Sequence, residues 1–387
     1  MKEKKIQIGS NRAYGLLMGL IGVLCLLCGC SKDESSTGNL NGEPEGTVLG
    51  EVASYVTGFD EANGANKANG ARRAWAIPGG YEAYGDGAQP IGIAFTVNGE
   101  EPKIGSFFKS GDKWRTSIED IDAKTYYLYG YIPNITGITF EVNGANGTHE
   151  AYSDGAIMTL KNVSSVMPND LCVVIGAKDG TGKETVSGLR MGDFGYTASA
   201  SSEGNYVFLL FDHLYAALRI RMRVHDDYNK LRTIKLKSLQ LSTQAGETTT
   251  KQKTTITVTL SSTDGGSPIN GVTFTPQGEA LDDGLEFWSS TAGEALTTEF
   301  QPFLGYFMPL SITSLSLTSI YDVYDKKGNL LRKDCKVTNR MVLNDLFSGQ
   351  TVALRGRRYT VNMTIQPTYL YMLSEPDLDN PTVIVNN

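Results

Sequence analysis

The chain has 387 residues, of which 40% are hydrophobic and 20% are charged, and its formal net charge is −7. These values are typical of a globular protein, and the length favours two domains over a single core. The acidic balance argues against nucleic acid as a partner.

The first 29 residues have the composition of an export signal. An apolar run over residues 16–28 is too short for a comfortable membrane span, and four basic residues precede it: Lys2, Lys4, Lys5 and Arg12. Loss of residues 1–29 would remove these four basic groups and one acidic group, changing the formal charge from −7 to −10. The mature surface is therefore expected to be acidic.

The residues that follow resemble a bacterial lipobox. Leu27-Cys28-Gly29-Cys30 places small residues before a cysteine, so Cys30 is the expected lipid anchor and the expected first residue of the mature chain. Ser31-Lys32-Asp33-Glu34 resembles the acidic tag that directs lipoproteins of Bacteroidetes to the outer face of the outer membrane. An ordinary signal with a chance cysteine is the alternative. The lipoprotein interpretation predicts a cell-surface protein.

Two cysteines remain beyond the signal, Cys172 and Cys335, one in each half of the chain. We expect them to be separate, with a disulfide between them as the alternative. Stability then has to come from the hydrophobic cores.

The N-terminal part of the mature chain alternates between polar and apolar stretches. Residues 30–47 read as a flexible tether, and Val48–Phe59 predicts a strand that is apolar on both faces. The small polar residues of Asp60–Ala71 cannot bury enough surface to order themselves, and they lead to Arg72-Arg73.

The rest of the chain shows short apolar runs separated by Gly, Pro, Asn and Asp. No segment has a sustained helical pattern, so the sequence predicts an all-β fold of two β-sandwiches in tandem. The expected domains are residues 48–204 and 205–387, with residues 181–205 as the boundary. The expected strands are Ile91–Val97, Trp114–Ile118, Tyr126–Ile132, Ile138–Val142, Ala156–Leu160, Leu171–Ala177, Thr254–Leu260, Val272–Phe274, Leu285–Trp288, Phe303–Met308, Ser311–Tyr324, Thr351–Leu354 and Tyr359–Ile365.

The central stretch Val207–Leu241 has the strongest strand pattern. From Leu218 to Val224 apolar residues alternate with Arg219, Arg221 and Arg223, which predicts a strand with one wet face. His225–Asn229 supplies turn residues before the alternation resumes, so we expect an antiparallel hairpin.

The C-terminal residues do not lose apolar character. Thr368–Leu373 is one strand signal, and after a polar hinge Thr382, Val383, Ile384 and Val385 form another. Exposed termini are normally polar and frayed, so this last strand is expected to need a partner.

Several motifs in this order resemble the fimbrillin family, the type V pilins of Bacteroidales. They are the lipobox with its acidic tag, Arg73-Ala74 before Trp75, Phe211-Asp212-His213-Leu214 leading into Ala217-Leu218-Arg219-Ile220, and Gly356–Ile365 before a terminal strand. The resemblance spans nearly the whole chain. The doubled arginine departs from the family pattern.

The resemblance implies a non-enzymatic fimbrial subunit with two transthyretin-like β-sandwich domains. It implies a lipid anchor in the outer membrane before assembly, and cleavage by an arginine-specific protease after Arg73, with Arg72 as the alternative. Residues 48–73 are then a removable pro-segment, and Thr382–Asn386 is the donor strand in donor-strand exchange with other pilin subunits. Host or bacterial surface molecules are the expected adhesion ligands. Stalk, anchor and tip subunits are not distinguished.

Catalytic and metal motifs are absent from the sequence, and no cofactor is expected. His149, His213 and His225 are too far apart for a metal pair on one element, and His213 reads as a hydrogen-bonded core histidine. The alternative function is a surface glycan-binding lipoprotein of a polysaccharide-utilisation system, with stacking platforms from Trp75, Trp114, Trp288 and the tyrosines. Aromatic residues in β-sandwiches more often pack in the core.

We predict that Cys30→Ala abolishes lipid labelling and membrane retention, because the acylated residue supplies the hydrophobic attachment that an acidic domain lacks. Palmitate labelling and membrane fractionation measure both effects. Cys172→Ala is the matched control and should label normally. A Cys30→Ala chain that still labels would exclude the lipobox interpretation.

Overall fold

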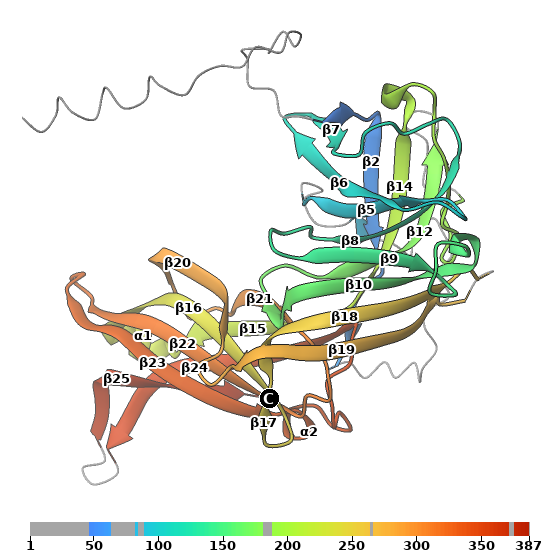
Figure 1. The fold of residues 1–387 in the computed structure, drawn as a ribbon. Helices are drawn as coiled ribbons and strands as arrows, with labels where there is room; N and C mark the ends of the chain where they lie inside the picture. The colour runs from blue at the N-terminus through green and yellow to red at the C-terminus, as the bar shows by residue number, and fades with distance from the viewer. Residues whose placement is uncertain are drawn as a thin grey trace, which may run out of the picture. The chain divides into compact units, whose positions relative to one another are not determined.

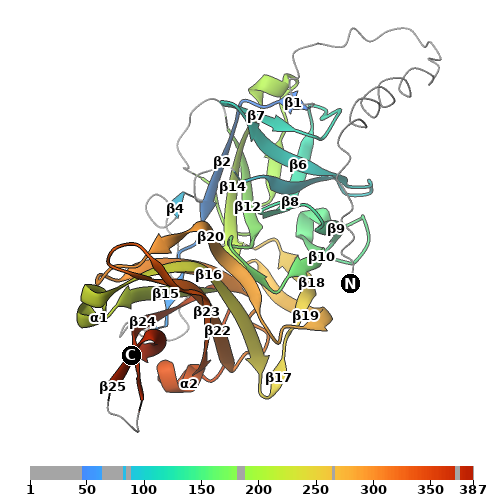
Figure 2. The same cartoon turned by 90° about the vertical axis from the view of Figure 1, so that its left-hand side faces the viewer.

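The computed structural model describes residues 46–62, 82–83, 89–180, 188–263, 266–370 and 375–386. Strands dominate these ranges and form four sheets that pack in pairs around two hydrophobic cores (Figures 1 and 2). The all-β, sandwich-like fold expected from the sequence is confirmed.

The first core lies between a ten-stranded and a four-stranded sheet. In order, the ten-stranded sheet contains β1 (Thr47–Val48), β7 (Lys113–Thr116), β6 (Lys103–Ser110), β5 (Ile91–Thr96), β8 (Thr125–Ile132), β12 (Cys172–Gly180), β14 (Tyr206–His213), β2 (Glu51–Val56) and β4 (Glu82–Ala83), with β13 (Gly195–Thr197) beside β8. The four-stranded sheet contains β19 (Ile269–Ala280), β18 (Lys251–Ser261), β10 (Gly155–Ser164) and β9 (Thr139–Gly144). Alternation orients these strands: Ile256, Val258 and Leu260 of β18 are fully buried between less buried threonines.

The second core lies between a six-stranded and a five-stranded sheet. The six-stranded sheet contains β11 (Val166–Met167), β21 (Gln301–Phe307), β15 (Ala216–Val224), β24 (Arg357–Leu370) and β25 (Glu375–Asn386), with β3 (Asp60–Glu61) also on β24. The five-stranded sheet contains β17 (Thr248–Thr249), β16 (Arg232–Ala245), β22 (Ser314–Asp325) and β23 (Leu330–Val342), with β20 (Leu285–Ala295) beside β16.

Helices are short in the described part of the chain. They are α1 (Asp226–Leu231), α2 (Leu343–Leu346) and two 3-10 turns, η1 (Tyr152–Asp154) and η2 (Ser202–Gly204). Within the described ranges, no helix has the length and apolar character needed to cross a membrane.

The hairpin expected in the central stretch is wrong, although the alternation is right. Leu218, Ile220 and Met222 of β15 are fully buried, but β15 and β16 belong to different sheets of the second sandwich. The expected turn is α1, whose first turn is capped by the His225 side chain accepting from the Asp227 N–H. Because both strands bury their apolar faces in the same core, the helix carries the chain from one sheet to the other.

The arginine face of β15 is half-buried and not, as the sequence had suggested, fully exposed to solvent. The guanidinium groups of Arg221 and Arg223 lie 5.0 and 4.6 Å from the centre of the Phe300 ring, and Arg223 donates to Thr364. Aromatic and hydroxyl neighbours therefore cover part of this face.

Sheet membership does not follow the expected boundary between residues 204 and 205. β14 pairs with β12 and β2, and β18 pairs with β10, so three strands of the second range (β14, β18 and β19) complete the sheets of the first sandwich. The division into two folding units stays a prediction.

Local patterns failed at a few further places. Thr351–Leu354 is not a strand but an irregular connection after α2, while β6 and β23 were not expected. β23 is mostly exposed, so it lacks the apolar face that makes a strand recognisable in a sequence. Cys172 and Cys335 are buried and free, which confirms the expectation that they are separate.

Candidate functional site

Residues 46–62, here called the lead segment, connect both ends of the ten-stranded sheet. β1 pairs with β7 at one end of the strand order, and β2 pairs with β14 near the other end. Between them, Leu49 N–H donates to Trp114 and Gly50 N–H to Asn205, each at 2.9 Å. A Cβ atom at Gly50 would lie 2.6 Å from the Glu203 carbonyl oxygen, so this crossing requires glycine.

β2 is a parallel strand near the edge of the sheet (Figure 2). It pairs with β14 from Glu51 opposite Tyr206 to Val56 opposite Phe211, and only the two residues of β4 pair with its other side among the described residues. Val52 and Val56 are 3% and 9% exposed. Burial of each valine contributes about 1.5–3 kcal/mol. The strand predicted over Val48–Phe59 is confirmed over Glu51–Val56, but only the face of Val52 and Val56 is buried, and the opposite face is half-buried.

After β2, the lead segment makes a polar contact with the end of β14. The Thr57 hydroxyl donates to Asp212 Oδ1 at 2.7 Å, and the Thr57 carbonyl lies 2.6 Å from His213 Nε2. The Phe59 ring stacks on the imidazole of His213, with 3.6 Å between the ring centres. Backbone pairing, a side-chain hydrogen bond and a ring contact therefore hold this part of the lead segment against β14.

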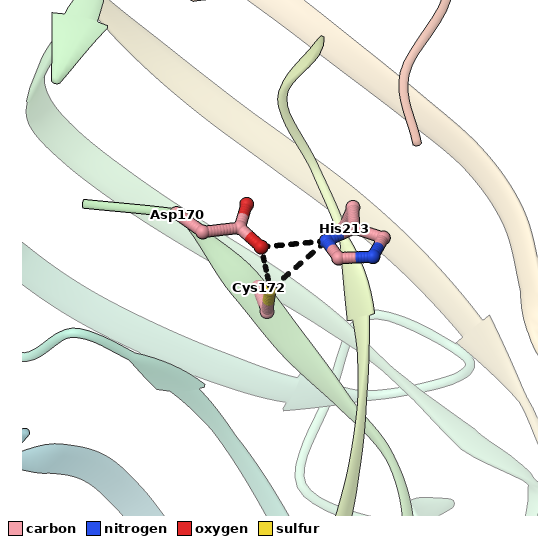
Figure 3. A group of neighbouring side chains, drawn as sticks. All are labelled: Asp170, Cys172 and His213. Atoms are coloured by element: carbon pink, nitrogen blue, oxygen red, sulfur yellow. Dashed lines mark hydrogen bonds and ion pairs between the residues drawn. The ribbon is translucent and has the colours of Figure 1, made fainter. Parts of the chain in front are cut away.

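His213 is buried, and both of its ring nitrogens face acceptors. Nε2 faces the Thr57 carbonyl and Nδ1 lies 2.6 Å from Asp170 Oδ2 (Figure 3). Both nitrogens donate only in the imidazolium form. Burial alone would lower the pKa of His213, but the charge and hydrogen bond of Asp170, the charge of Asp212 and the Thr57 carbonyl together outweigh it, and the pKa is raised. The expected core histidine is confirmed, and it carries a buried charge.

Arg355 completes the charge balance. Its Nη1 donates to Asp212 Oδ2 at 2.9 Å and to the His213 carbonyl at 2.8 Å. Burial alone would raise the pKa of Asp212, but the charges of Arg355 and His213 lower it. We call Thr57, Asp170, Asp212, His213 and Arg355 the polar junction. Two carboxylates and two cations offset each other there, and this compensation allows His213 and Asp170 to be buried, while the side chains of Asp212 and Arg355 stay 19% and 20% exposed.

Beyond the polar junction the lead segment reaches the second sandwich. β3 pairs in parallel with Arg357 and Arg358 of β24, and Asp60 N–H donates to Gly356 at 2.9 Å. Glu61 forms ion pairs with Arg358 and, at 3.6 Å, with Arg219. The lead segment therefore contacts sheets of both sandwiches.

The C-terminal strand is docked on its own chain. β25 pairs with β24, with Val383 opposite Ile365 and Val385 opposite Met363. Val383 is 3% exposed, whereas Ile384 is 37% exposed. Because β15 occupies one edge of β24, β3 and β25 follow each other along the other edge, at residues 357–358 and 362–370.

Asp170, Cys172 and His213 are the group of described residues that could approach one metal ion, since one ligand atom from each lies within 4.8 Å of the others. Two ligands of a tetrahedral zinc ion lie about 3.4 Å apart, given metal–ligand distances near 2.1 Å. The 2.6 Å between Asp170 and His213 is instead a hydrogen-bond distance. Burial also raises the pKa of the Cys172 thiol, so this cysteine is no thiolate nucleophile. The cluster is suited to holding structure.

Several predicted residues lie outside the described part of the chain: Cys30, Arg72, Arg73 and Trp75. Of the remaining tryptophans, Trp114 is 5% exposed, and Trp288 packs edge-on against Phe303 with 4.8 Å between ring centres. Sequence reasoning missed Thr57, Asp170 and Arg355. The signal that could have pointed to them is Asp212-His213 within an apolar strand, because buried charges require partners.

No protein-family model and no curated protein matches the chain. Solved structures are similar to it at low identity. A candidate cell adhesion protein from Bacteroides uniformis is 14% identical, with 87% of this chain and 97% of that chain covered and a TM-score of 0.33. The fimbrial anchor protein Mfa2 from Porphyromonas gingivalis is 10% identical, with 87% and 97% covered and a TM-score of 0.21. A fimbrial protein from Bacteroides ovatus is 8% identical, with 82% and 49% covered and a TM-score of 0.29. With TM-scores this low, function has to be argued from the residues.

The buried charge on His213 predicts a pH dependence. A raised folded-state pKa stabilises the folded chain fully below the unfolded value of about 6.5, and this stabilisation is lost as the pH rises through the folded-state pKa. The difference in unfolding free energy between wild type and His213→Gln should therefore shrink between pH 6 and pH 9. Urea titrations measure it. A pH-independent difference for His213→Gln would contradict the assignment.

Proposed function

We propose that this protein is a structural subunit of a cell-surface fimbria that supports adhesion. It is exported as a lipoprotein that is anchored through Cys30. Cleavage after Arg73 then breaks the covalent link between the lead segment and the rest of the chain. The observation that carries the proposal is the docking of the lead segment, an apolar strand near a sheet edge that lies ahead of two adjacent arginines. The resemblance of the sequence motifs to fimbrillins supports it.

Removal of such a strand has a physical consequence. Buried backbone N–H and C=O groups need partners, and departure of β2 leaves those of β14 unpaired beside an apolar groove. A strand from a second subunit restores the pairing, with alternate side chains filling the groove. The apolar C-terminal strand Thr382–Asn386 is the proposed donor. The contact is head to tail, so it builds a filament.

The partners follow from this scheme. They are other pilin subunits, an arginine-specific processing protease, the outer membrane through the lipid anchor before assembly, and host or bacterial surface ligands. The protein is proposed to reach the cell surface as an outer-membrane lipoprotein. The proposed assembly requires neither nucleic acid nor a cofactor.

The glycan-binding alternative receives no support from the two tryptophans that are described. Trp114 is buried, and Trp288 is half-buried against Phe303, so neither offers an open stacking platform. A glycan-binding protein also has no need of a removable strand.

We predict that surface protein purified from cells begins at Ala74, as N-terminal sequencing measures. Arg73→Ala should move the cut to Arg72 or abolish it, and the double substitution of both arginines should abolish it, because an arginine-specific protease then lacks a residue to recognise. Arg190→Ala, at an exposed arginine of another loop, is the control. Wild-type protein that begins at Cys30 within assembled fibres would contradict the processing step.

Deletion of residues 382–387 should leave a lipidated and cleavable subunit that cannot join the next one. Some loss of stability is expected, because Val383 is buried and contributes about 1.5–3 kcal/mol. Heat-stable ladders in gels measure polymerisation. Leu330→Ser, at an exposed position of β23, is the control and should polymerise normally. Full polymerisation by the truncated chain would remove the donor role from this strand.

A further inference from the structure

We propose that the polar junction recognises one side chain of the incoming strand, a neutral hydrogen-bond donor in the place of Thr57, and so fixes the register of that strand on β14. The occupant we infer is the C-terminal strand of a second copy, with Asn386 in that place. This inference rests on the proposed function, since it requires the lead segment to leave.

The junction makes two separate demands on the strand that covers β14. His213 Nε2 needs a carbonyl acceptor, which any strand backbone supplies at this position. Asp212 Oδ1 accepts from the His213 N–H of its own strand at 3.0 Å, and its second donor, at 2.7 Å, is the Thr57 side chain and not a backbone group of the lead segment. The second demand therefore selects among side chains, whereas the first selects only an extended backbone.

The surrounding charges limit which side chains can take the place of Thr57. Asp212 is already paired with Arg355, and His213 with Asp170. A lysine or arginine in the place of Thr57 would bring a third cation to a balanced site, and an aspartate or glutamate would face the Asp212 carboxylate. An apolar side chain would remove this donor and leave the part-buried Asp212 Oδ1 with the His213 N–H alone. Thr, Ser, Asn and Gln satisfy the site.

The sequence of the C-terminal strand fits this requirement in one register. Val383 and Val385 share the buried face of β25, and Val52, Ser54 and Val56 share one face of β2. Placing Val385 on the position of Val56 keeps the apolar faces together and puts Val383 on the position of Ser54. Asn386 then takes the place of Thr57, where its amide can donate to Asp212.

The register that uses Thr382 in the place of Thr57 is disfavoured. It puts Pro381 on the position of Val56 and Asp377 on that of Val52, which is 3% exposed. Proline removes a backbone donor from the ladder, and a carboxylate would enter an apolar core. The junction and the hydrophobic alternation therefore select the same register.

Competition between peptides tests the inference on the full chain. A site-specific protease site in place of Arg72-Arg73 allows the chain to be cut, and a fluorescent peptide of residues 46–62 reports rebinding by polarisation. Unlabelled peptides of residues 375–387 compete as wild type, Asn386→Thr, Asn386→Leu and Thr382→Val. The last is the matched control, because Thr382 falls on the position of Ala53, away from the junction.

We expect the wild-type and Asn386→Thr peptides to compete within about threefold of each other, Thr382→Val to match them, and Asn386→Leu to bind at least tenfold more weakly. A labelled peptide carrying Thr57→Val should show the same loss relative to Thr57→Ser.

Three outcomes separate the inference from the proposed function. Failure of the wild-type lead peptide to rebind or exchange would overturn strand replacement itself, and the inference with it. Equal competition by the Asn386→Leu peptide would overturn side-chain recognition at the junction while strand replacement stands. Rebinding of the lead peptide without competition by any C-terminal peptide would overturn the second copy's C-terminal strand as the occupant.

Discussion

The edge of β14 is the constraint on which the molecule depends. Its residues from Val207 to Phe211 are at most 5% exposed, so its backbone groups lie where water cannot replace a missing partner. β12 satisfies one edge and the lead segment the other. Some strand has to occupy that second edge in every folded state of the protein. In our proposal, the strand that does so differs between the free subunit and the assembled fibre.

The polar junction fixes the register of the strand that pairs with this edge. Backbone pairing by itself tolerates slippage, and apolar alternation excludes only odd shifts. The largely buried Asp212 carboxylate marks one position along the strand, because one of its donors is the side chain of a single residue of the covering strand. The cost of removing these four charges wholly or largely from water is offset because each one faces an opposite charge, and removal of any single member leaves another charge uncompensated.

The same segment also links the two sandwiches. β3 and β25 lie in line along one edge of β24, so the strand proposed to leave and the strand proposed to be donated are neighbours on one ladder. When Glu61 leaves with the lead segment, Arg358 and Arg219 lose this ion-pair partner at the start of the β24 edge. Departure of the lead segment thus alters the surroundings of both sheets.

The strand content of the fold was predictable because it rests on local alternation, as in β15 and β18. The pairing was not, because it depends on which faces meet: two strands that look like a hairpin face each other across a core. The buried state of His213 was predictable from its apolar neighbours. Its partners were not, because Thr57 and Arg355 lie 155 and 143 residues from Asp212 in the sequence, and no local pattern specifies such contacts.

The most direct test of this account is the cryo-electron microscopy structure of the assembled fibre, which shows which segment pairs with β14. The account predicts residues 382–386 of a neighbouring subunit beside Phe208–Phe211, with Asn386 at Asp212 and no density for the subunit's own lead segment. A fibre in which β2 of the same subunit still pairs with β14 would contradict it.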